Sequence, residues 1–193
     1  GKGNSESVNL LNHRGVKAVG ISGKDAGLIR AKKKLATVYD GDDAKKVDIG
    51  YVGEVEKVDT GLLDDLIDHD YIPVIAPIGV DEEGASYNIN ADYVAAEIAG
   101  ALHAEKLLLL TDIEGVYKDY HDKDTFISTL HQAEAREYIK TGIIEGGMIP
   151  KIEACLKALD AGAVKAHIID GRLAHSILLE VLTPQGIGTQ VVR

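Results

Sequence analysis

Apolar residues recur along the chain in the two periods that distinguish strands from helices. Short apolar runs predict buried strands at 16–21, 71–80, 106–112 and 164–170, and a closing strand at 189–193. Amphipathic stretches predict helices from Asn4 or Ser5 to Gly15 and at 60–70, 91–102, 131–142, 150–161 and 175–183. Because strands and helices alternate, we expect an α/β fold with a mainly parallel sheet.

Residues 28–58 follow a different pattern, typical of a β-ribbon. Val47, Ile49, Tyr51 and Val55 alternate with polar residues, and the turn-forming segment "GDDAKK" (41–46) separates the two halves. In the 150–161 helix, by contrast, a stripe of apolar residues at helical spacing should face the core: Ile152, Cys155, Leu156 and Leu159.

Composition narrows the class of protein. The 193 residues are 45% hydrophobic and 27% charged, which is typical of a globular domain. The net charge of −10 argues against a nucleic-acid or membrane binder, although an anionic substrate can still meet a locally positive site. One cysteine, no apolar run of about 20 residues and no signal core in "GKGNSESVNLLNHRG" predict a soluble cytoplasmic protein.

The segment "YNINAD" (87–92) places two amides and a carboxylate at the start of a predicted helix. Asn90 suits an N-cap, and Asp92 lies where an acid complements the helix dipole. Simple capping is one interpretation. The other is that Asn88 contacts a substrate while Asp92 holds nearby lysines in place.

The segment "EGGMIPK" (145–151) combines two glycines, a helix start and a lysine. A lysine in the first turn opposes the helix dipole, and a phosphate would satisfy both the lysine and the helix end. The alternative is a solvated surface lysine after a flexible loop. Since ligands of open parallel sheets bind beyond the carboxyl ends of strands, we expect this loop, the segment 111–117 and the loop after 71–80 in one crevice.

Other segments carry weaker signals. "SGKDAG" (22–27) matches no phosphate-loop consensus, no dinucleotide fingerprint is present, and "RAKKK" (30–34) suits a solvated ribbon edge. The seven histidines show no metal-ligand spacing, so we expect no protein-held metal.

Four motifs occur in a specific order: "NINAD", "LLTDIEGVY", "GGMIPK" and "HIIDGR…HSILLE…GIGT". Over essentially the whole chain they resemble the acetylglutamate kinases of the amino acid kinase family. The resemblance implies a three-layer αβα sandwich. It also implies transfer of the ATP γ-phosphate to the side-chain carboxylate of N-acetyl-L-glutamate, the second step of arginine biosynthesis.

The resemblance also implies roles for individual residues. Asn88 would bind acetylglutamate, Asp92 would organise catalytic lysines, and Lys151 would stabilise the transferring phosphoryl group. ATP, arriving with Mg²⁺, would be bound by Thr111, Asp112, Gly115, Val116, Tyr117, Gly147, Met148 and Lys151.

A regulatory site follows from the tail of the chain. His167, Glu180, Gly186 and Gly188 resemble positions that bind inhibitory arginine in feedback-controlled members, which are usually ring-shaped hexamers. The resemblance implies that the full-length form is a homo-oligomer, a dimer or hexamer. Alternatively, Glu180 only forms the polar face of an amphipathic helix.

Parts of the family pattern are not found in this sequence. These are a glycine-rich strand-loop with the other catalytic lysine, an HGGG-type loop and an arginine-bearing segment. We therefore expect residues 1–193 to form a single, amino-terminally incomplete kinase domain, with the ATP-binding part at about 88–193, lacking catalysis on its own. Two other functions remain: a related kinase for carrier-linked aminoadipate or glutamate, and a non-catalytic fragment that binds arginine or nucleotide.

Overall fold

The computed structural model describes residues 2–184 and 186–193. By the density of internal contacts the chain divides into two compact units, residues 1–94 (unit 1) and 95–193 (unit 2). Within the described residues, every helix is too short or too polar to cross a bilayer.

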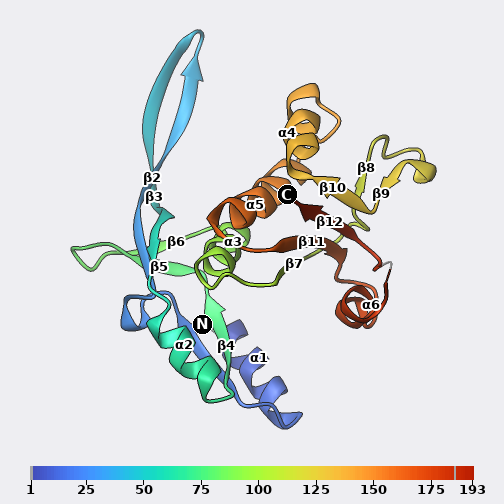
Figure 1. Cartoon of the computed structure of the whole chain (residues 1–193). Helices are drawn as coiled ribbons and strands as arrows, with labels where there is room; N and C mark the ends of the chain where they lie inside the picture. Colours follow the sequence, from blue (N-terminus) through green and yellow to red (C-terminus); the bar gives the residue numbers. More distant parts are fainter. Residues whose placement is uncertain (1, 185) are drawn as a thin grey trace. The chain divides into compact units, whose positions relative to one another are not determined.

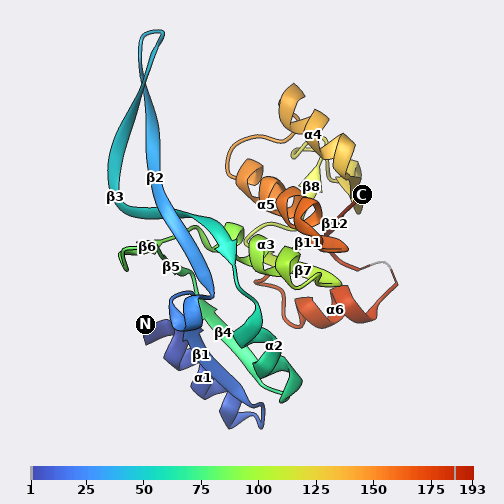
Figure 2. The same cartoon turned by 60° about the vertical axis from the view of Figure 1, so that its left-hand side comes forward.

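Unit 1 is built on a pair of parallel strands. Its elements are α1 (Lys2–His13), β1 (Ala18–Ser22), η1 (Asp25–Gly27), β2 (Ile29–Asp40), β3 (Asp43–Val58), α2 (Gly61–Asp68), β4 (Ile72–Ala76), β5 (Ile78–Val80) and β6 (Ser86–Asn88). Strands β1 and β4 pair in parallel. Helices α1 and α2 lie on opposite sides of this pair (Figures 1 and 2). Unit 1 is therefore layered helix, sheet, helix.

The predicted ribbon is confirmed, with a tighter turn than expected. Strands β2 and β3 pair antiparallel and extend away from the rest of unit 1, while their bases close a small barrel with β5 and β6 (Figure 2). The expected turn at 41–46 was too long, because Ala44 and its two following lysines pair with β2. Gly41, at φ 64°, allows the chain to reverse within two residues.

Two other expectations about the elements were wrong in detail. The strand predicted at 71–80 is divided into β4 and β5 at Pro77, which has no N–H to donate to a ladder. The helix predicted to begin at Pro150 begins at Met148 instead, and Pro150 still lies in the first turn, where a missing N–H breaks no helical hydrogen bond.

Unit 2 is built on a four-stranded sheet. Helix α3 (Ala91–Ala101) leads into it, followed by β7 (Lys106–Thr111), β8 (Val116–Tyr117), η2 (Lys123–Thr125), β9 (Phe126–Ile127), β10 (Thr129–His131), α4 (Gln132–Thr141), α5 (Met148–Ala161), β11 (Lys165–Asp170), α6 (Ser176–Leu182) and β12 (Thr189–Val192). The strand order is β10-β12-β11-β7, and only the β11–β12 pair of this sheet is antiparallel among the described residues.

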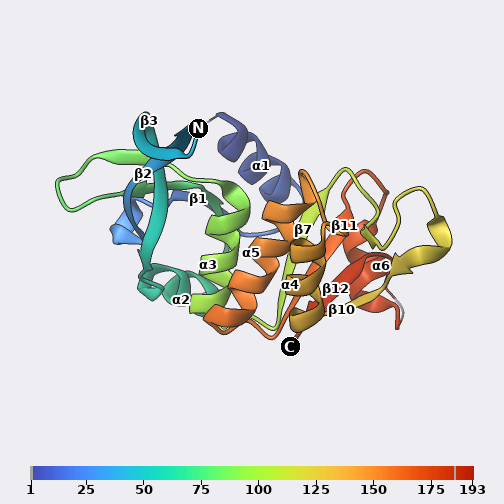
Figure 3. The ribbon, with the colours of Figure 1, turned by 90° about the horizontal axis from the view of Figure 1, so that it is seen from above.

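Helices cover both faces of this sheet. Helices α4 and α5 lie on one face, and α6 lies on the other (Figures 1 and 3). The predicted apolar stripe of α5 is confirmed, since Ile152, Cys155, Leu156 and Leu159 are all buried. The expected α/β class with helix–sheet–helix layers is thus confirmed, and parallel pairing predominates in the layered sheets, while the ribbon of unit 1 is antiparallel.

Helices α3 and α5 approach each other closely at Gly100, which leads to a prediction about this residue. A Cβ atom at Gly100 would overlap the Cβ of Ala161 and lie 3.2 Å from its backbone carbon. We expect Gly100→Ala to lower the free energy of unfolding by about 1–3 kcal/mol, as overpacking usually does. Gly3→Ala is the matched control, because Gly3 is also helical but has nothing within 4 Å. Thermal unfolding of both variants checks this, and equal stabilities would contradict the close packing.

Candidate functional site

A cavity of about 730 Å³ lies at the carboxyl end of β7 in unit 2. Two segments line it, one following β7 and one joining α4 to α5. The lining residues are Thr111, Asp112, Ile113, Gly115, Val116, Tyr117, Lys118, Asp119, Tyr120, His121, Thr141, Gly142, Ile143, Ile144, Glu145, Gly147, Met148 and Lys151. All eight residues that the sequence suggests for nucleotide binding are among them.

The first wall depends on a glycine and a buried hydroxyl. A Cβ at Gly115, whose φ is 157°, would lie 2.6 Å from Oγ1 of Thr189, so only glycine fits this approach. The N–H of Val116 donates to Thr189 Oγ1 at 2.9 Å, and that hydroxyl donates to the carbonyl of Ile127 at 2.6 Å. Thr189 on β12 therefore fixes both strands of the β8–β9 hairpin.

A cation and aromatic rings stabilise the same hairpin. The hydroxyl of Tyr117 donates to the Glu114 carboxylate, and Lys123 Nζ lies 3.1 Å from that carboxylate and 4.5 Å from the centroid of the Tyr117 ring. The Tyr117 hydroxyl, followed by Lys123, holds the pKa of Glu114 below its usual value. The β8–β9 hairpin therefore carries an exposed ion pair, Glu114 with Lys123, beside aromatic rings.

The second wall is the loop before α5. Gly142 ends α4 in the left-handed conformation, at φ 78°, and turns the chain into this loop. The N–H groups of Met148 and Ile149 donate to the carbonyls of Glu145 and Gly146 at 3.3 and 3.2 Å. Because these two N–H groups are used in turns and Pro150 has none, α5 offers an anion its dipole and Lys151.

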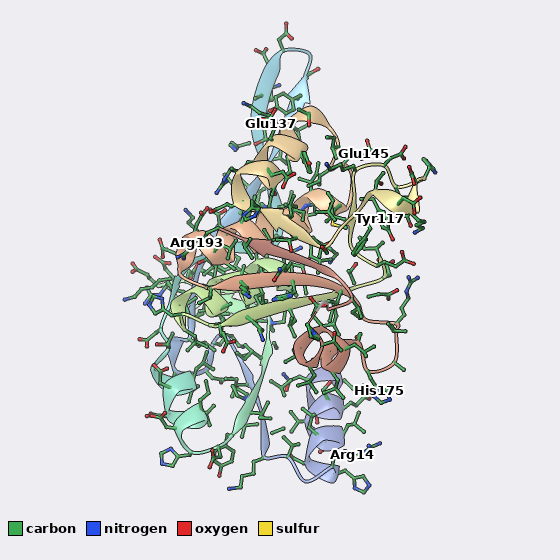
Figure 4. The ribbon with its side chains drawn as sticks, turned by 45° about the vertical axis from the view of Figure 1, so that its right-hand side comes forward. Arg14, Tyr117, Glu137, Glu145, His175 and Arg193 are labelled. Carbon is green, nitrogen blue, oxygen red and sulfur yellow. The ribbon has the colours of Figure 1, made fainter. Side chains whose placement is uncertain are left out.

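The cavity contains charges of both signs. Lys118 and Lys151 are the lysines of its described lining, and Asp112, Asp119 and Glu145 are the carboxylates. Tyr117 and Glu145, which belong to different walls, are labelled in Figure 4. Among the described residues no three His, Cys, Asp or Glu side chains gather to hold a metal ion. The arrangement suits a ligand that has both apolar and ionic parts.

The residues of "YNINAD" lie in unit 1. Asn90 caps α3, because its Oδ1 accepts the N–H of Asp92 at 2.9 Å and that of Tyr93 at 3.2 Å. Asn88 is exposed at the end of β6, opposite Ile78. The capping interpretation is confirmed for Asn90, while the substrate role of Asn88 and the lysine-organising role of Asp92 stay predictions, as does the contribution of the loop after 71–80.

The predicted effector residues meet in a second cluster. His167 on β11 lies with Nδ1 2.7 Å from Oε1 of Glu180 on α6. The N–H groups of Ile187 and Gly188 donate to Glu180 Oε2 at 2.6 and 3.0 Å. At Gly186, with φ 62°, a Cβ would lie 2.6 Å from that same oxygen. The glycines therefore let the tail close over one carboxylate.

This cluster is buried. Glu180 is only 9% exposed, so the interpretation of it as the polar face of an amphipathic helix was wrong. Burial raises the pKa of Glu180, but the N–H of Ile187, the ring of His167 and the N–H of Gly188 outweigh it and leave that pKa below its usual value. His167 Nε2 is a buried nitrogen with no hydrogen-bond partner among the described residues.

Sequence reasoning missed several lining residues: Lys118, Asp119, Tyr120, His121 and residues 141–144. They belong to a short hairpin and a loop, which carry no periodic pattern. The one available signal was the second tyrosine in "YKDYH" (117–121), an aromatic residue next to a strand end.

The depressed pKa of Glu180 leads to a prediction about how the stability of the fold depends on pH. The charged form stabilises the folded state fully above the unfolded pKa of about 4.5, and this contribution is lost as pH falls through the lower folded pKa. We expect Glu180→Gln to cost about 1.5–3 kcal/mol at pH 7, the usual worth of hydrogen bonds to a charged group. Thermal unfolding should show this difference shrinking below pH 4.5.

The matched control is Glu137→Gln on the exposed surface of α4 (Figure 4). It should change stability little at any pH. A difference for Glu180→Gln that stays constant with pH would contradict the charge assignment.

Comparison with known proteins agrees with this geometry. Residues 1–170 match the model of the amino acid kinase family. The chain is 52% identical over 192 residues to an acetylglutamate kinase of Moorella thermoacetica and 53% identical over 194 residues to one of Heliobacterium modesticaldum. These matches cover the whole chain but only 65% and 66% of the relatives.

Among solved structures, the chain is similar to N-acetylglutamate synthase from Neisseria gonorrhoeae in complex with coenzyme A and L-arginine. The TM-score is 0.71 at 28% identity, over 92% of this chain and 38% of that one. The family match, the whole-chain similarity to acetylglutamate kinases and the shared fold lead to one conclusion: the chain belongs to the amino acid kinase family.

Proposed function

We propose that this chain is the nucleotide-binding part of an acetylglutamate kinase. The enzyme would transfer the γ-phosphate of ATP to the side-chain carboxylate of N-acetyl-L-glutamate in arginine biosynthesis. The observation that carries the proposal is the cavity in unit 2, where all eight suggested nucleotide residues meet. The relatives named acetylglutamate kinase, at 52–53% identity, support the choice of acceptor.

The cavity has the properties that ATP requires. Lys151 can face the phosphates, and Tyr117 and Met148 supply apolar surface. Phosphoryl transfer needs positioning and positive charge around the spreading negative oxygens, and little covalent chemistry from the protein. Mg²⁺ arriving with ATP would neutralise phosphate charge, and Asp112, Asp119 and Glu145 are carboxylates of the lining that can approach it.

Catalysis needs more than this cavity. Asn88 would bind acetylglutamate, and Asp92 would hold the lysines that face the phosphoryl group. About a third of each relative has no counterpart in this chain. We therefore propose nucleotide binding without turnover for the chain as it stands, with the second catalytic lysine and the substrate loops belonging to that remaining third.

The role of Lys151 is tested by binding. Replacing Lys151 by alanine removes a charged contact worth about 1.5–3 kcal/mol, so we expect the Kd for Mg-ATP to rise about tenfold or more in isothermal titration. Lys140→Ala is the control, because Lys140 is an exposed lysine of α4 outside the described lining. An unchanged Kd for Lys151→Ala would remove Lys151 from the phosphate site.

An ADP-release assay on acetylglutamate accompanies the titration. ADP release at the background rate is the expected result for this chain. Turnover on acetylglutamate would mean that Lys151 suffices as the catalytic lysine. Turnover on carrier-linked aminoadipate or glutamate would favour the related kinase instead.

A second proposal concerns regulation by arginine. The His167–Glu180 cluster contains a buried carboxylate, which is a suitable partner for a guanidinium. The similar synthase structure was solved in complex with L-arginine. Because Glu180 already accepts the N–H groups of Ile187 and Gly188, a guanidinium would replace at least one of these bonds and shift the 186–188 loop. In the complete protein, we propose, this site acts within a dimer or hexamer.

Thermal unfolding tests the arginine site. We expect saturating L-arginine to raise the Tm of the wild-type chain by several degrees, since a ligand at 100 times its Kd contributes about 2.7 kcal/mol. Glu180→Ala should abolish the shift, and L-lysine should produce none because it lacks the planar guanidinium. Equal arginine shifts in wild type and Glu180→Ala would contradict the site.

A further inference from the structure

We propose that Tyr120 is the surface on which the base of the nucleotide stacks, and that Lys123 and Tyr117 position it. This inference rests on the proposed nucleotide site and goes beyond it, because it assigns the recognition of the base to one side chain. Tyr120 lines the cavity, yet its side chain is 61% exposed. An exposed aromatic ring inside a cavity offers a planar surface to a planar ligand.

The orientation of Tyr120 is fixed by its neighbours. Its ring lies nearly perpendicular to that of Tyr117, at 85° with centroids 5.8 Å apart, and the His121 ring lies 6.2 Å away at 78°. Lys123 Nζ lies over the Tyr120 ring at 5.1 Å from its centroid. Such contacts hold an exposed tyrosine in one position before a ligand arrives, which lowers the entropic cost of stacking.

Lys123 lies over one side of the Tyr120 ring. Lys123 covers Tyr120, but within the described part of the chain Lys123 is not a lining residue of the cavity, whereas Tyr120 is. One side of the Tyr120 ring is therefore occupied by a cation. The opposite side of the ring remains for a base. Any base can stack on an aromatic ring, because every base has a π-face.

The rest of the cavity separates the two parts of a nucleotide. Tyr120 belongs to the wall that follows β7, while Lys151 and the start of α5 belong to the other. The phosphates would be attracted to Lys151 and the helix dipole, and the base would lie against Tyr120. Binding of the base and binding of the phosphates thus depend on different residues.

Two ligands separate these contributions: Mg-ATP, and Mg-tripolyphosphate, which has no base. We expect Tyr120→Ala to weaken Mg-ATP binding about tenfold, because base stacking contributes on the order of one to two factors of ten in affinity. Binding of Mg-tripolyphosphate should stay unchanged. Tyr120→Phe should bind both ligands as the wild type does, and Tyr39→Ala, which removes a 72% exposed tyrosine of the ribbon, should change neither.

Tyrosine fluorescence gives a second measurement. The chain has eight tyrosines and no tryptophan, so its emission comes from tyrosine. We expect saturating Mg-ATP to quench part of this emission in the wild type and in Tyr39→Ala, and to quench the emission of Tyr120→Ala less. Lys123→Ala should weaken Mg-ATP binding partially, and Lys123→Arg should restore it, since a guanidinium also stacks on aromatic rings.

The outcomes distinguish this inference from the proposed function. Unchanged Mg-ATP affinity in Tyr120→Ala would overturn the stacking role while leaving the nucleotide site intact. An equal loss of both ligands would also overturn it, because the residue would then act only by supporting the wall. If the wild type bound neither ligand, the proposed function and this inference would fail together.

Discussion

The cavity of unit 2 depends on the two hydrogen bonds that the hydroxyl of Thr189 makes. This hydroxyl is fully buried, and it joins three strands that are distant in the sequence: β12 carries it, β8 donates to it through Val116, and β9 accepts from it through Ile127. A buried N–H or carbonyl without this partner would cost about 1–3 kcal/mol. Because Gly115 approaches the same hydroxyl, this contact also sets the path of the first wall.

The chain as a whole is acidic, with a net charge of −10, so an anionic ligand needs a local arrangement of cations. In unit 2 the cation that can meet such a ligand is Lys151, because the other lysine of the described lining, Lys118, interacts with Tyr138 and Glu134 of α4. The dipole at the start of α5 adds to this field, although its first N–H groups are used in turns. The glycines on both walls bring backbone close to the ligand volume, which side chains would otherwise fill.

Those features of the fold that follow from side-chain periodicity and from short motifs could be predicted from the sequence. The apolar stripe of α5 and the alternation of strands and helices follow from side-chain spacing, and the Asn90 cap follows from residue type. The hairpin after Tyr117 could not be predicted, because tertiary contacts from Thr189 and Lys123 determine it and neither leaves a local pattern. The start of α5 at Met148 was missed for a similar reason: turns to Glu145 and Gly146 begin the helix before Pro150.

Amide NMR of the labelled chain during titration with Mg-ATP tests the nucleotide site most directly. The predicted result is that the signals of residues 111–121 and of the non-proline residues in 141–151 shift together, with one dissociation constant. The signals of the ribbon, residues 32–55, and of the 186–188 loop should not move. Shifts confined to other segments, or no shifts at millimolar ATP, would contradict the assignment of this cavity to a nucleotide.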